Sequence, residues 1–154
     1  MFKKILKKKD TDDDKNVLVA ALLIHAAKID ENYSTEEKEI IKKAIINLNK
    51  ISSEKADKVL INAEKKEMES NQIIEFTREI KKKSIEYRMN IIEILWKIVY
   101  SDGTNDEYES NLIRRVCGLL YVSDKESGMI KLKVKNQQDK IWPTLLMKTV
   151  LNAN

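Results

Sequence analysis

Apolar residues recur along most of this chain at the three- and four-residue spacing of amphipathic helices. No run of alternating β-branched residues is bounded by turns, so the pattern predicts no strand. Three glycines and one proline leave few breakers, which favours helices with short connections. We therefore expect an all-α, single-domain bundle of about seven helices. The expected helices cover residues 16–29, 34–49, 52–67, 70–80, 84–101, 106–121 and 123–137, with a short element near 143–151.

Several predicted helices begin with the pattern of a capping box. Ser34 stands three residues before Glu37, and Ser123 stands three residues before Glu126. In such a box the hydroxyl accepts from a free amide of the first turn, and the glutamate returns to the amide of the cap residue. Asp106 followed by Glu109 resembles the same arrangement, and single serines precede other helices. These caps indicate where the helices begin.

One segment of the chain repeats. Residues 22–44 align with residues 94–116, and each copy reads as an apolar helix, an acidic turn and a second apolar helix. We therefore expect two internally repeated helical hairpins. Both copies hold carboxylates at one Asp-x6-Glu spacing: Asp30 with Glu37, and Asp102 with Glu109.

Composition places the chain among soluble globular proteins. It has 154 residues, of which 42% are hydrophobic and 35% charged, enough for one well-formed core. We divide it into an arm of residues 1–15, a helical domain of residues 16–137 and a tail of residues 138–154. No apolar run is long enough to span a membrane, and no secretory signal opens the chain. One cysteine excludes an internal disulfide, so we expect a cytoplasmic location.

The net charge of +4 is concentrated in the arm. Without the first nine residues, 24 basic side chains face 25 acidic ones, so the body is near neutral and nucleic-acid binding is not expected. Apolar residues among the lysines are typical of a short interfacial anchor, and the alternative is a solubilising tail. Weak contact with an anionic membrane, at the inner face, would use Lys3, Lys4, Lys7, Lys8 and Lys9.

The two acidic turns are the strongest candidates for a site. Asp30 and Asp102 each follow the end of a predicted helix, where the dipole is negative and a carboxylate is disfavoured by roughly 0.3–1 kcal/mol. A positive group has to compensate the negative charges of these two aspartates. It is the N-terminus of the next helix, a lysine or a cation. Oxygen-only ligands suit Ca²⁺ or Mg²⁺, although neither turn has the glycine and glutamate of an EF-hand loop. The candidate metal ligands are Asp30, Glu37, Asp102, Asp106 and Glu109. For Glu37, Asp106 and Glu109, helix capping is a full explanation without any metal.

The remaining reactive residues favour structural roles. His25, the single histidine, lies on an apolar helix and is expected to be partly buried. Cys117 lies in an apolar stretch, and Trp96 with Tyr100 has core spacing. One histidine does not assemble a catalytic triad, and there is no phosphate-binding loop. We therefore expect no enzyme activity and no small-molecule substrate.

The strings LLIHAAKIDENYSTEEKEII, FTREI and ILWKIVYSDGTNDEYESNLIRRVCGLLYVSDKE resemble the TerB-like family of tellurite-resistance domains. The similarity covers residues 16–135. It implies a bundle of about seven helices, a link to tellurite resistance and stress tolerance, and divalent-cation binding through acidic residues. Related domains occur in membrane-linked co-chaperones. Two features depart from the family: Glu31 stands where a glycine is frequent, and the tail with Trp142 has no counterpart.

Together these observations predict a non-enzymatic adaptor in a bacterial stress response, which binds a protein partner and responds to divalent cations. The first alternative is a metal-free protein–protein interaction module, membrane-peripheral or linked to co-chaperones. The second is a metal-dependent hydrolase that uses the same carboxylates.

Overall fold

The computed structural model describes residues 12–29, 33–70, 72–101 and 107–137. These residues form seven α-helices and a short 3-10 helix, and they contain no strand. The predicted all-α bundle is thus confirmed. The elements are α1 (Asp12–Lys28), α2 (Thr35–Asn49), α3 (Ser53–Glu69), α4 (Ile73–Thr77), η2 (Ile80–Lys82), α5 (Ile85–Tyr100), α6 (Glu107–Leu120) and a C-terminal helix of residues 124–137.

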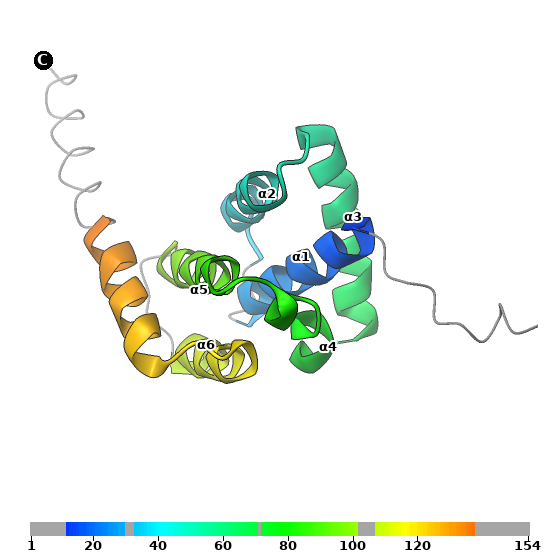
Figure 1. Ribbon diagram of the computed structural model, residues 1–154. Coiled ribbons are helices and arrows are strands. Elements are labelled where there is room, and N and C mark those ends of the chain that lie inside the picture. The colour runs from blue at the N-terminus through cyan, green and yellow to red at the C-terminus, as the bar shows by residue number, and fades with distance from the viewer. Residues whose placement is uncertain (1–11, 30–32, 71, 102–106, 138–154) are drawn as a thin grey trace, which may run out of the picture.

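Helix α1 forms the centre of the bundle (Figure 1). It contacts α2, α3, α4 and α5, and its residues from Leu18 to Ile24 are 0–4% exposed. A helix that is apolar around its circumference has to be covered on all sides, which explains the central place. The helix begins four residues earlier than predicted, because Asp13 and Asp14 in its first turn interact favourably with the positive end of the dipole.

Serine caps set the starts of most other helices. The C-terminal helix carries the full capping box: Glu126 N donates to Ser123 Oγ over 3.1 Å, and Ser123 N donates to Glu126 Oε2 over 3.0 Å. Such local bonds satisfy amides that have no partner inside the helix. In three further helices, a serine hydroxyl accepts a hydrogen bond from the backbone amide three residues later. The pairs are Ser34 with Glu37 N, Ser52 with Lys55 N and Ser84 with Tyr87 N.

The fourth predicted helix is two short elements. Helix α4 has five residues and ends at Thr77, whose Oγ1 donates to Ile74 O over 3.2 Å, and η2 follows. A threonine hydroxyl that bonds its own preceding turn weakens a helix there. Burial holds the segment in place, since Ile73, Phe76 and Ile80 are 0–3% exposed.

Helix α5 lies between α2 and α6, and the C-terminal helix packs beside α5 (Figure 1). The indole Nε1 of Trp96 donates to Ser127 Oγ across 3.2 Å, which fixes this packing. Trp96 is 5% exposed, and its ring stacks on Tyr100 at a centroid distance of 6.1 Å. Near the start of α5, Arg88 Nη1 donates to the carbonyl of Leu120 over 2.8 Å and satisfies the end of α6.

The core follows the apolar positions of the sequence. Eight residues that the periodicity places inside the bundle are 0–5% exposed: Leu23, Ala27, Ile41, Phe76, Leu95, Trp96, Ile113 and Leu120. Matched positions of the two proposed hairpins, such as Leu23 and Leu95, are buried alike, as a repeat requires. The connections 30–32 and 102–106 are outside the described residues, so the internal duplication stays a prediction.

Candidate binding sites

Most of the predicted metal ligands lie outside the described residues. This holds for Asp30, Asp102 and Asp106, and of Glu109 the structure describes the helical backbone alone. Glu37 is described: it lies in the first turn of α2, is 3% exposed, and its amide donates to Ser34 Oγ. In the described part of the chain, no group of three or more histidine, cysteine, aspartate or glutamate side chains is arranged to hold a metal ion.

A polar network joins the last turn of α1 to α3. Its centre is Glu67 on α3, which is 8% exposed. Glu67 Oε2 lies 2.7 Å from Lys28 Nζ, and Glu67 Oε1 lies 3.2 Å from His25 Nδ1. Burial alone would raise the pKa of Glu67, but hydrogen bonds from Lys28 and His25 outweigh it, so the pKa is below its ordinary value. The carboxylate is therefore ionised at neutral pH and ties α3 to α1.

The same network reaches Tyr33, the first described residue after the connection 30–32. Tyr33 OH donates to Glu64 Oε1 over 3.1 Å, and Lys38 Nζ lies 4.7 Å from the centre of the ring. Burial raises the pKa of Tyr33 well above its ordinary value, and the charges of Glu64, Glu37 and Glu67 raise it further. Three glutamates therefore act on one phenol directly beside the first acidic turn.

Glu64 and Glu67 are not among the site residues predicted from the sequence. One signal for Glu67 was present, because it continues the buried stripe of α3, which is formed by Ala56, Val59 and Ala63 at helical spacing. A carboxylate at the end of an apolar stripe requires a positive partner. The predicted structural role of His25 is confirmed, since its side chain is 20% exposed and bonded to Glu67.

A groove with a volume of about 610 Å³ lies between α2 and α5. Ile40, Ala44 and Leu48 form its floor on α2, and Ile94 contributes from α5. These three α2 residues form one apolar stripe, four positions apart, and they stay partly buried, whereas the neighbouring stripe of Ile41 and Ile45 is in the core. Helix α2 therefore presents a second apolar face that the described helices do not cover fully.

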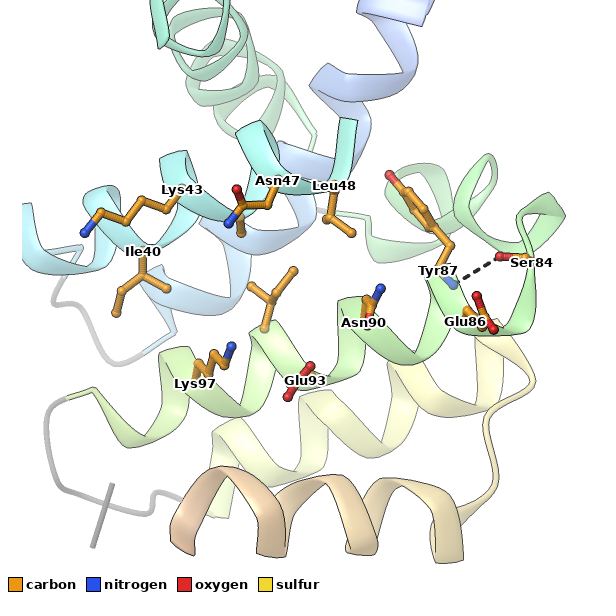
Figure 2. A pocket seen from close by; sticks show the side chains of 12 residues that line it. Ile40, Lys43, Asn47, Leu48, Ser84, Glu86, Tyr87, Asn90, Glu93 and Lys97 are labelled. Atoms are coloured by element: carbon orange, nitrogen blue, oxygen red, sulfur yellow. Dashed lines mark hydrogen bonds between the residues drawn. The ribbon is translucent and has the colours of Figure 1, made fainter. Parts of the chain in front are cut away.

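The rim of this groove is charged, with opposite signs at its two ends. Figure 2 shows Lys43 and Lys97 near one end and Glu86 at the other, with Asn90 and Glu93 between them on α5. The helices run in opposite directions along the groove, because the end of α2 lies beside the start of α5. Glu93 also forms an ion pair with the C-terminal helix, with 3.1 Å between its Oε1 and Lys133 Nζ.

Cys117 offers no reactive thiol. It is 1% exposed, and burial raises the pKa of its thiol. A buried thiol with a raised pKa is a poor nucleophile and a poor metal ligand at neutral pH. Its predicted place in the core is confirmed.

No described helix is both long and apolar enough to cross a membrane.

The geometry defines an all-helical module with an open apolar groove and a buried polar network. The sequence model of one family, described as tellurite resistance protein TerB, matches residues 16–132. The chain therefore belongs to the TerB family, as its resemblance predicted, and domains of this family are in general non-catalytic. The search of curated proteins returned no match to this chain, and neither did the search of solved structures.

Proposed function

We propose that this TerB family member is a non-enzymatic adaptor in a tellurite-resistance or stress response, and that it binds a helix of a partner protein in the α2–α5 groove. The observation that carries the proposal is the second apolar stripe of α2. Ile40, Ala44 and Leu48 stay partly exposed on the floor of an open groove. Apolar stripes at this spacing are how a groove receives the apolar face of an amphipathic helix.

The charges of the rim specify this partner further. A helix has a positive N-terminal and a negative C-terminal end. Its N-terminus is therefore complementary to Glu86, and its C-terminus is complementary to Lys43 and Lys97. We expect the partner segment to be an amphipathic helix with acidic residues in its last turns. Rim charges of this kind set orientation and association rate more than affinity.

Site-specific cross-linking tests the proposal. A photo-reactive amino acid replaces Asn47 at the groove, or Lys58 on the exposed face of α3 as the matched control, and the linked peptide is identified by mass spectrometry. We expect links at Asn47 to an amphipathic segment of another protein. The variant Ala44→Arg, which places a charged chain on the floor, should remove them. Equal linkage from both positions, or links at Asn47 that survive Ala44→Arg, would contradict the proposal.

A response to divalent cations is the second candidate function. It is supported by the convergence of Glu37, Glu64 and Glu67 on Tyr33, beside the turn that holds Asp30. Glu64 is already paired with Lys38, and Glu67 with Lys28 and His25, so a cation would have to be held chiefly by the turn itself. Calorimetric titration with Ca²⁺ and Mg²⁺ tests this function separately from the groove. A metal-dependent hydrolase is the least supported of the three, because His25 is committed to Glu67.

A further inference from the structure

A second hollow, of about 380 Å³, lies where four segments far apart in the sequence meet. They are the start of α1, residues 49–55 from the end of α2 to the first turn of α3, residues 79–83 around η2, and the start of α5. Each of the first three contributes lysine, and Glu79 is the one carboxylate among the described residues that line the hollow. The four lysines are Lys15, Lys50, Lys55 and Lys83.

The charge of this hollow is positive after its ion pairs are counted. Glu79 Oε1 lies 3.2 Å from Lys82 Nζ and 3.9 Å from Arg78 Nε, so basic side chains outside the hollow already balance it. Lys55 lies 3.1 Å from Asp13. Among the described residues no carboxylate lies within 4.0 Å of the other three lysines, Lys15, Lys50 and Lys83. A lysine has three donors and no acceptor, so such a group attracts anions.

Two amide side chains add neutral polar groups to the same wall. Asn49 Oδ1 accepts from Tyr87 OH over 3.2 Å, but Asn49 Nδ2 is buried and has no acceptor among the described residues. A buried N–H without an acceptor is costly, and a ligand oxygen would satisfy it. Asn16 lines the hollow as well and is 8% exposed. The nearby N-terminus of α3, which Ser52 caps, gives the positive end of a 17-residue helix dipole.

We propose that this hollow binds a phosphate group, as a phosphomonoester dianion. Three lysines without described carboxylate partners, one buried amide donor and a helix N-terminus all favour negative oxygen atoms, and lysine is a common phosphate ligand as a point charge. The hollow exceeds the size of one phosphate ion, so the ligand carries an organic part. That part belongs either to a soluble phosphate ester or to a lipid headgroup.

We test the site by titrating the full chain with inorganic phosphate. Calorimetry measures the binding, and the NMR signal of the Asn49 side-chain amide reports where the ion binds. We expect saturable binding of one ion and a shift of that signal. The variant Lys50→Asn with Lys83→Gln should weaken binding at least about tenfold, as loss of charge-assisted hydrogen bonds requires. Lys50 has φ 51°, and asparagine tolerates this left-handed conformation, so the fold is preserved.

The control variant is Lys58→Gln with Lys65→Gln, which removes the same charge from the exposed face of α3. It should bind phosphate as the wild type does. Vesicles of phosphatidic acid, compared with vesicles of phosphatidylcholine, show whether the phosphate group belongs to a lipid. If only Lys50→Asn with Lys83→Gln loses binding to phosphatidic acid, the ligand is a lipid headgroup. If that variant loses phosphate binding but still binds the vesicles, the ligand is a soluble ester. Equal weakening in both variants, or binding of neither phosphate nor vesicles, would overturn the proposal.

Discussion

Glu67 on α3 and Lys28 in the last turn of α1 form an ion pair, with 2.7 Å between Oε2 and Nζ. The lysine lies at the negative end of the α1 dipole, where a cation is favoured, and the glutamate extends the apolar stripe of α3. His25, one turn earlier, holds the other oxygen of the carboxylate. The pair therefore joins the two helices next to the acidic turn.

Replacing Glu67 by glutamine should destabilise the protein at pH 7 by about 1–3 kcal/mol, as expected for the loss of hydrogen bonds to a charged group. Since the pKa of Glu67 is lower in the folded than in the unfolded chain, its ionised form stabilises the fold above the ordinary glutamate pKa of about 4.3. This contribution disappears as the pH falls through the lowered pKa. Urea unfolding of both proteins between pH 7 and pH 3 measures the difference.

The matched control is Asp57→Asn, which breaks the ion pair with Lys42 on the surface. Asp57 is 58% exposed, so its loss should change the free energy of unfolding by no more than about 1 kcal/mol. If Glu67→Gln costs as little as Asp57→Asn, or if its cost does not shrink toward acid pH, the buried pair does not stabilise the fold.

Trp96→Ala should cost roughly 3–5 kcal/mol, because it empties a large volume between α5 and the C-terminal helix. Ser127→Ala removes the hydroxyl that accepts from the indole and should cost about 0.5–1.5 kcal/mol. In Trp96→Phe, which keeps a ring but no donor, Ser127→Ala should cost less than it does in the wild type. Thermal or urea unfolding of this double-mutant cycle measures the coupling, and a coupling of zero would contradict the hydrogen bond.

Deleting residues 1–11, up to the start of α1, should leave the melting temperature nearly unchanged. The sequence of the arm has no apolar period long enough to pack on the core. The same deletion should abolish binding to anionic vesicles, because five lysines leave with it. Sedimentation with vesicles measures this, and equal binding by both proteins would remove the membrane role of the arm.

Asp30→Asn combined with Asp102→Asn tests the cation response of the two acidic turns. Millimolar Ca²⁺ or Mg²⁺ should raise the melting temperature of the wild type, since a ligand of the folded state stabilises it. The double variant should lose this response and, without metal, be about as stable as the wild type, because unfavourable charges at two helix ends are removed. A wild type that ignores divalent ions and a strongly destabilised variant would show that these aspartates are structural caps.

The sequence by itself determined the helices and the inward face of each. Ser34, Ser84 and Ser123 mark starts because each cap bond joins residues three positions apart, and this distance is set within one turn. Burial of Leu23, Phe76 and Leu95 follows from the helical period for the same local reason. The hydrophobic period did not predict the early start of α1 or the break after Thr77. At the first place the charges of Asp13 and Asp14 extend the helix, and at the second the hydroxyl of Thr77 ends it.

The tertiary structure alone decided which polar groups meet. Glu67 lies 42 positions from His25 in the sequence, and Lys15 and Lys83 line one hollow from opposite halves of the domain. The α2–α5 groove likewise depends on how two helices separated by α3 and α4 pack on α1. Such meetings depend on the directions and crossing angles that the whole core imposes on its helices, and no pattern within one segment contains that information.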